Sequence, residues 1–212
     1  MTSSTVPVVG LVVEGQTEYA ALPGLLARLG LRTTAPSVFH GQPAAASPKS
    51  LVEGRLLKPV RVQLAKDARR VIVVLDREAR AESAKEFAER LCRELRRQVK
   101  RSEGAVAARR VWVAVADRCF ENWLLADPQG VSKSTLLAKN ANLVGKVACH
   151  ADDRDAVALL RSALTRGWYE KAIHGPQLAQ HIRVADPRAR WCSRSFEAFL
   201  RLVLPLVGET NG

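Results

Sequence analysis

Acidic side chains follow three apolar segments of strand length along this chain. In each case the first acidic residue lies within two residues of the end of its segment, and the second follows the first by two to four residues. They are Glu14 and Glu18 after residues 6–13, Asp76 and Glu78 after residues 71–75, and Asp117 and Glu121 after residues 111–115. Carboxylate oxygens are the ligands that Mg²⁺ and Mn²⁺ prefer in proteins. If the six carboxylates meet in space, we expect them to bind Mg²⁺ or Mn²⁺.

The elements around these residues predict how they meet. The three apolar runs read as buried strands, and the leucines that recur at helical spacing after Thr17 predict a helix against the sheet. Ser83 and Glu86 form a capping-box pattern before a second helix. Strands joined by long helical crossovers predict an α/β fold, with a mostly parallel sheet covered by helices on both faces. Ligands of such sheets bind at the carboxyl edge, where all six carboxylates would lie.

The chain divides by pattern near Asp127-Pro128, after which no strand signal remains. We expect an α/β core over residues 1–128 and a helical extension or subdomain packed on it over residues 129–212. A loop is expected over residues 40–50, then a helix over residues 51–68 that Pro59 disturbs. In the extension we expect helices at residues 136–137, 157–164 and 196–207, and a helix break at Gly175-Pro176.

Charge points to the class of partner. The 212 residues include 33 Lys and Arg against 21 Asp and Glu, a formal net charge of +12. Such a cation attracts nucleic acid, although the charge can also serve only to keep a surface soluble. The four cysteines form no CxxC pair, which argues against a zinc site, and no apolar stretch is long enough to span a membrane. We expect a cytoplasmic protein with no membrane contact.

Several segments resemble one family. LVVEGQTE (11–18) and VIVVLDRE (71–78) look like the two acidic motifs of Toprim domains. The pattern is most similar to the overcoming-lysogenisation-defect (OLD) nucleases and to stand-alone Toprim-like proteins of bacterial defence loci. VADRCFENWLLAD (115–127) and SRSF (193–196) look like the stand-alone type. Glu78 departs from the second motif, where Asp is usual.

The resemblance implies a Mg²⁺- or Mn²⁺-dependent nuclease that hydrolyses phosphodiester bonds in DNA or RNA. Glu14, Asp76 and Glu78 would hold one metal, and Glu18, Asp117 and Glu121 would complete a second site or orient water. Catalysis would rest on Glu14 and on Lys171, in WYEKAIHG (168–175), beside the phosphate. The resemblance also implies an ATPase partner in anti-phage defence. The chain itself has no nucleotide-binding glycine loop.

Simpler interpretations stay open for each residue. Glu14 and Glu18 can serve a helix dipole, Asp76 can cap a loop, and Asp117 and Glu121 can pair with arginines. Lys171 can be an ordinary surface lysine. A topoisomerase needs a nucleophilic tyrosine, and the chain has only Tyr19 and Tyr169. Tyr19 falls in the first helix beside the acidic motif, so a topoisomerase is disfavoured. A non-catalytic, metal-stabilised nucleic-acid-binding or regulatory subunit is the main alternative to a nuclease.

Overall fold

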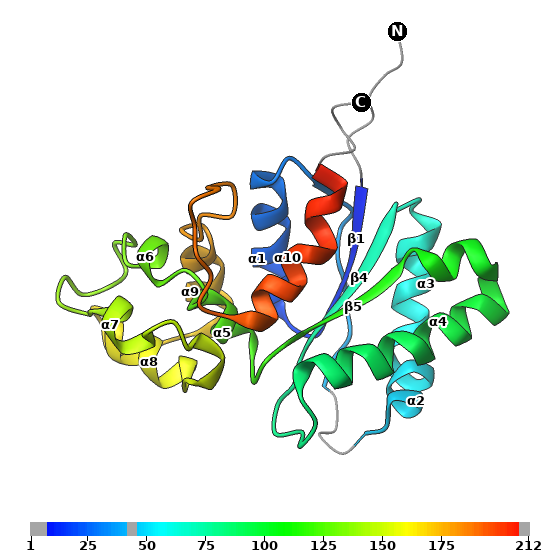
Figure 1. The fold of residues 1–212 in the computed structure, drawn as a ribbon, viewed down its shortest axis with the longest axis horizontal. Coiled ribbons are helices and arrows are strands. Elements are labelled where there is room, and N and C mark those ends of the chain that lie inside the picture. The colour runs from blue at the N-terminus through cyan, green and yellow to red at the C-terminus, as the bar shows by residue number, and fades with distance from the viewer. Residues whose placement is uncertain (1–7, 42–45, 208–212) are drawn as a thin grey trace, which may run out of the picture.

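Three runs of buried residues form the long strands of a parallel sheet (Figure 1). The computed structural model describes residues 8–41 and 46–207. Its strands are β1 (Val8–Val13), β2 (Arg32–Thr33), β3 (Ser37–Val38), β4 (Arg70–Asp76) and β5 (Val111–Ala116). The order is β2-β1-β4-β5, β3 also pairs with β1, and every pairing is parallel. The predicted α/β class is confirmed, and the predicted strands are found wherever the structure describes them; Val6 and Pro7 lie outside the described residues.

The two faces of the sheet bury alternate side chains against different helices. Leu11 and Ile72 pack on the face covered by α1 and α10, whereas Val12 and Val73 pack on the other face. The helices of the core are α1 (Gln16–Arg28), α2 (Pro48–Leu51), α3 (Leu57–Ala65), α4 (Ala84–Arg109) and α10 (Arg194–Val207). The capping box before α4 is present as predicted. Helices therefore cover both faces, with α3 and α4 opposite α1 and α10 (Figure 1).

The expected disturbance at Pro59 takes a specific form. Helix begins at Pro48, within the segment expected to be a loop, and runs to Ala65 through a π-helical turn, η1 (Val52–Leu56). Pro59 cannot donate a hydrogen bond, and its ring would crowd the carbonyl of Arg55 in a regular α-helix. The π-helical turn changes the geometry just before Pro59, so the helix continues instead of breaking there.

The C-terminal third is helical but differs in detail from the expectation. Its elements are α5 (Phe120–Leu124), α6 (Pro128–Val131), α7 (Leu143–Val147), the 3₁₀ turn η2 (Ala151–Asp153), α8 (Ala156–Ala163) and α9 (Lys171–Ala179). Leu136 and Leu137 are not helical, and Leu137 forms an isolated bridge with Leu164. The expected break at Gly175-Pro176 is also wrong, because α9 continues through both residues. The carbonyl of Ala172, which Pro176 cannot bond, belongs to an exposed residue that water can reach.

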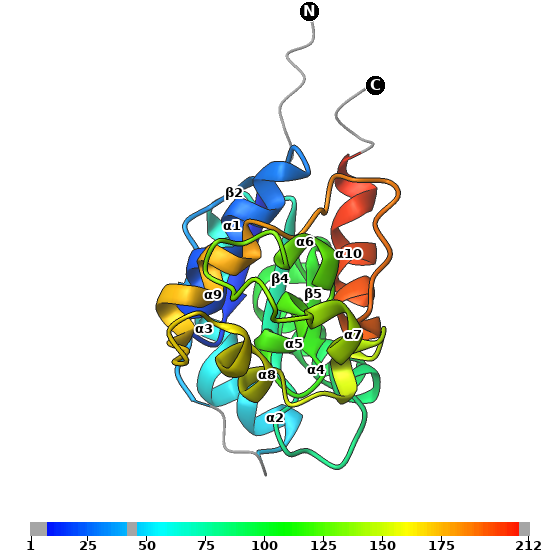
Figure 2. The same ribbon diagram turned by 90° about the vertical axis from the view of Figure 1, so that its left-hand side faces the viewer.

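The helices α5 to α9 lie beside α1 and α10, nearest the viewer in Figure 2. They share a continuous hydrophobic cluster with one face of the sheet, so residues on both sides of position 128 build the same core. Helix α9 packs along α1, and this contact brings the extension to the carboxyl ends of the strands. Within the described residues, no helix is both long and apolar enough to cross a lipid bilayer.

Candidate functional site

A hydrogen bond between two of the predicted residues, Glu14 and Asp76, joins the carboxyl ends of β1 and β4. Glu14 follows β1, and its Oε2 accepts a hydrogen bond from the backbone N–H of Asp76, the last residue of β4, at 3.1 Å. Glu18 lies in the first turn of α1 and is buried. Its side chain folds over Gly15, where a Cβ atom would approach Oε2 of Glu18 to 3.0 Å. The Glu-Gly turn thus keeps both glutamates at the sheet edge.

The end of β5 contributes Glu121, which lies in the first turn of α5. Only 1% of this residue is exposed, so its charge needs a partner. Lys171 supplies one, with Nζ 3.1 Å from Oε2, and the hydroxyl of Tyr169 donates to Oε1 at 3.4 Å. Over half of the Lys171 side chain, 54%, remains exposed. The lysine therefore joins the buried carboxylate to the solvent side of the site.

Mutual repulsion shows which carboxylates are neighbours. Burial, followed by the charges of Glu121 and Glu14, raises the pKa of Glu18 to about 7, whereas a backbone hydrogen bond and the charge of Lys171 oppose the rise. Burial also holds the pKa of Asp76 well above its usual range, followed by the charges of Glu18, Glu14 and Glu121. Burial alone would lower the pKa of Lys171, but the charge and hydrogen bond of Glu121 raise it overall. The structure therefore brings four predicted carboxylates and the predicted lysine together.

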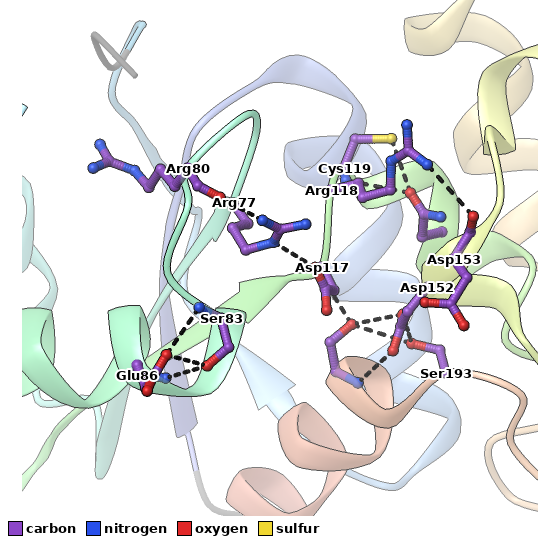
Figure 3. A network of polar contacts seen from close by, with 12 residues as sticks. Arg77, Arg80, Ser83, Glu86, Asp117, Arg118, Cys119, Asp152, Asp153 and Ser193 are labelled. Carbon is purple, nitrogen blue, oxygen red and sulfur yellow. Dashed lines mark hydrogen bonds and ion pairs between the residues drawn. The ribbon is translucent and has the colours of Figure 1, made fainter. Parts of the chain in front are cut away.

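The other two predicted carboxylates lie differently. Asp117 turns to Arg77, whose Nε is 2.5 Å from Oδ1, as the simpler interpretation of this residue expected (Figure 3). Glu78 is exposed and has a positive φ of 56°. Its charge still raises the pKa of Asp76, but by less than burial or the charges of Glu18, Glu14 and Glu121. Glu78 thus lies at the margin of the cluster and Asp117 is bonded elsewhere.

The donor chemistry of the cluster suits a hard divalent cation. Glu14, Glu18, Asp76 and Glu121 offer only oxygen, and their mutual repulsion is what a cation would relieve. Across residues 8–41 and 46–207, however, no three His, Cys, Asp or Glu side chains already stand where they could hold a metal ion. Glu14 is bonded to backbone and Glu121 to Lys171 and Tyr169. Metal binding at this site therefore requires these side chains to rotate.

A buried polar network beside the site was not foreseen from the sequence. Ser195 Oγ accepts hydrogen bonds from the backbone N–H of Asp117 at 3.1 Å and from the indole of Trp123 at 2.9 Å. Asp152 in turn accepts from the hydroxyl of Ser193 at 2.6 Å and from Ser195 at 3.0 Å (Figure 3). In the sequence, the segment SRSF (193–196) indicated only a family resemblance and no hydrogen-bonding role. The network fixes the end of β5 against the start of α10.

Two further neighbours of the predicted residues were missed for different reasons. Tyr169 lies two positions before Lys171, but nothing in the local sequence links its hydroxyl to a carboxylate fifty positions away. Arg77 stands inside the second acidic motif, between Asp76 and Glu78. No local signal shows that its guanidinium turns to the neighbouring strand end.

Comparison with known sequences gives one family. The sequence model described as "Domain of unknown function (DUF4276)" matches residues 13–203. That range includes all the carboxylates above, Lys171, and the Ser193–Asp152 network. Neither a curated protein nor a solved structure matches the chain.

Proposed function

The chain belongs to the DUF4276 family, and we propose that it is a Mg²⁺- or Mn²⁺-dependent nuclease that hydrolyses phosphodiester bonds in DNA or RNA. One observation carries the proposal: Glu14, Glu18, Asp76 and Glu121 gather at the carboxyl edge of the sheet, where burial and the neighbouring carboxylate charges raise the pKa of Glu18 and of Asp76. Folding such repelling charges together costs free energy, and a bound cation would offset that cost.

In the proposed mechanism the four carboxylates hold the metal, with Glu78 available at the margin. A divalent cation, when bound, supplies Lewis acidity for attack on a phosphodiester. Glu14 orients its carboxylate through the N–H of Asp76, and Glu121 is oriented by Tyr169. Lys171 presents an ammonium group that is partly exposed and able to neutralise charge on the phosphate.

The Toprim resemblance and the charge of the chain add support. In the resembling motifs, acidic residues follow the strands in the same way as Glu14 and Asp76, and we propose that residues 1–128 form a Toprim-like core. A net charge of +12 favours a polyanionic substrate. The ATPase partner and the defence role that the resemblance implies remain part of the same proposal.

A non-catalytic, metal-stabilised regulator is the second candidate. The observation that favours it is that, within the described residues, no three ligating side chains are already in place. A protein that is only stabilised by a cation can bring its ligands together on binding, whereas turnover needs them held in the productive geometry. The two candidates differ in one measurable respect, which is turnover.

The decisive experiment measures cleavage of plasmid, single-stranded DNA and RNA with Mg²⁺ or Mn²⁺, and with EDTA as the blank. We expect metal-dependent cleavage by the wild type and only the EDTA background from Glu14→Gln/Asp76→Asn. The matched control, Glu53→Gln/Asp67→Asn, removes two exposed carboxylates elsewhere and should cleave normally.

Melting temperatures distinguish the remaining outcomes. A cation that binds the folded state raises the melting temperature by mass action, and the Glu14/Asp76 variant should lose this rise. A metal-induced rise without cleavage of any substrate would favour the regulator. A double variant that responds to Mn²⁺ like the wild type would place the metal elsewhere.

A further inference from the structure

One edge of the sheet lies at the bottom of a groove. β5 is the last strand in the order, with α4 on one face of the sheet and α10 on the other (Figure 1). Between these two helices runs a groove of about 810 Å³. Trp112 and residues 113–115 of β5 form its floor, and Asp117 lies at the end nearest the acidic site. The groove therefore follows β5 toward the carboxyl edge.

Both walls of this β5 groove carry cations. Lys85, Arg93 and Arg96 project from α4, and Arg194 and Arg201 project from α10. Their positions along the helices repeat at three to eight residues, which places them on one face of each helix. An elongated polyanion lying along β5 would thus meet positive charge on both sides.

The acidic residues of the groove do not cancel this charge. On the walls, Glu197 lies 3.5 Å from Arg201, and Glu89 is the other acidic residue. Asp117 is bonded to Arg77, and Asp152 accepts hydrogen bonds from Ser193 and Ser195. Five wall cations therefore face two wall carboxylates.

A second basic hollow extends the groove. It has a volume of about 280 Å³ at the amino ends of β4 and β5 and shares Trp112 with the groove. Four arginines line it: Arg69, Arg70, Arg109 and Arg110. Together the two hollows form a positive track from the amino edge of the sheet to Asp117. Asp76, in the acidic site, lies on the adjacent strand, paired with Ala116.

The edge of β5 is poorly suited to accept an added protein strand. At one end, Arg96 Nε donates to the carbonyl of Val111 at 2.8 Å, and the Cys92 thiol lies 3.8 Å from the same oxygen. At the other end, Ser195 accepts from the N–H of Asp117. Strand addition needs a run of backbone groups with no partner, and side chains close this run at both ends.

The groove also limits the width of its ligand. Helices on opposite faces of one sheet lie about two layer spacings apart, roughly 20 Å between axes, and the helices themselves fill about 10–12 Å of that distance, which leaves a gap of roughly 10 Å at the sheet edge. A duplex, whose major groove alone is about 12 Å wide, does not enter such a gap. A single strand does, with its phosphates between the two rows of cations.

We infer that the β5 groove binds a single strand of nucleic acid and leads it along the sheet edge to the acidic site. What happens to the strand at that site rests on the proposed function, whereas binding in the groove does not require it. The groove is thus a binding surface for the nucleic acid that is separate from the residues that would hold the metal.

The test measures anisotropy of short fluorescein-labelled oligothymidylate and oligouridylate in EDTA, where cleavage cannot occur. Arg93→Gln/Arg194→Gln removes one cation from each wall, neither of which makes an ion pair within the described residues. We expect binding at 0.1 M salt to weaken roughly tenfold or more, and the salt slope to fall by about 1.4 for two lost phosphate contacts. Arg32→Gln/Arg161→Gln, two exposed arginines outside the groove, is the matched control and should bind normally.

A second variant tests the space without changing charge. Ala198 is exposed on the α10 wall, so Ala198→Trp should fill the groove and weaken binding while circular dichroism stays unchanged. Wild-type affinity in both groove variants would overturn the inference, as would tight binding of polyglutamate with no binding of either oligonucleotide. Glu14→Gln/Asp76→Asn should bind at least as well as the wild type, because it removes negative charge at the end of the track. Wild-type protein that binds both oligonucleotides in EDTA but cleaves neither with Mg²⁺ or Mn²⁺ would refute only the nuclease.

Discussion

At the residue scale, Glu121 shows why the acidic cluster is more than a set of solvated side chains. It is almost fully buried, yet its partner Lys171 is more than half exposed. A buried carboxylate bonded to one flexible ammonium and one phenol is strongly perturbed by losing either. The charge of the same lysine opposes the rise in the pKa of Glu18, so the lysine acts on more than one carboxylate of the cluster.

We predict that Lys171→Met separates chemistry from binding. The variant should keep its fold and most of its affinity for nucleic acid, because a single partly exposed lysine adds little to either. Cleavage should fall by roughly 10²-fold or more, the scale of a lost electrostatic donor at the reacting phosphate. Rates under single-turnover conditions measure the loss, with Lys133→Met, an exposed lysine elsewhere, as the control.

Circular dichroism must accompany these rates. A folded Lys171→Met protein that cleaves at the wild-type rate would remove the lysine from the mechanism. The carboxylates would then have to account for the activity without it.

At the scale of elements, the contact between α1 and α9 places Lys171 at the site. Gly175 faces Thr17 there, and a Cβ atom at position 175 would stand 2.5 Å from Cγ2 of Thr17. Lys171 lies one helical turn earlier on α9, and Glu18 follows Thr17 on α1. A displacement of one helix against the other therefore changes the distance between the lysine and the glutamates.

We predict that Gly175→Ala destabilises the protein by about 1–3 kcal/mol, the usual cost of overpacking, and lowers cleavage with it. Thr17→Ser removes Cγ2, so Thr17→Ser/Gly175→Ala should recover most of both. Gly24→Ala, on α1 with no atom near the new methyl group, should be neutral or stabilising. Chemical denaturation measures all four proteins, and a Gly175→Ala protein as stable as wild type would contradict the packing argument.

At the scale of the whole molecule, opposite charges are separated in space. The chain is strongly basic overall, yet four carboxylates collect at one edge of the sheet and arginines line the other edge and the β5 groove. Positive surfaces attract a polyanion from a distance, and a carboxylate cluster repels it unless cations bind there first. Under the proposed function, bound metal would therefore favour the binding of nucleic acid, and bound nucleic acid that of metal.

The carboxylates also predict how stability depends on pH without metal. Glu18 has a folded pKa of about 7 against an ordinary value of 4.5, so the folded state holds its proton more tightly than the unfolded chain. This contribution is complete below about pH 4.5 and is lost as the pH rises through about 7, a difference of roughly 3 kcal/mol. Asp76 shifts in the same direction.

We therefore expect the free energy of unfolding in EDTA to fall between pH 5 and pH 8. Glu18→Gln should flatten the curve and stabilise the protein at pH 8, and Mn²⁺ should do the same for the wild type. Urea denaturation across this range measures the effect. Metal-free stability that rises from pH 5 to pH 8 would show that these carboxylates do not repel one another in solution.

The sequence by itself determined the three long strands, the α/β class and the carboxylates at their ends, but not the two-residue strands β2 and β3. These depend on local pattern: continuous apolar runs of strand length, a capping box at Ser83, and acidic residues directly after each run. Parallel strands share one carboxyl edge, so Glu14 and Asp76 were expected at the same edge once the strands were recognised, and the pairing of β1 with β4 in the structure makes them neighbours. No distant contact was needed to infer the shared edge.

Only the tertiary structure decided which carboxylates stay together. Asp117 pairs with Arg77 and therefore turns away from the cluster. Lys171 contacts Glu121, fifty positions earlier in the chain, because the packing of α9 on α1 brings Lys171 to the carboxyl ends of the strands. The passage of α9 through Gly175-Pro176 also depends on that packing, since local propensity favours a break. Side-chain pairing between distant segments depends on where the backbone places them, and such placement leaves no periodic signal in the sequence.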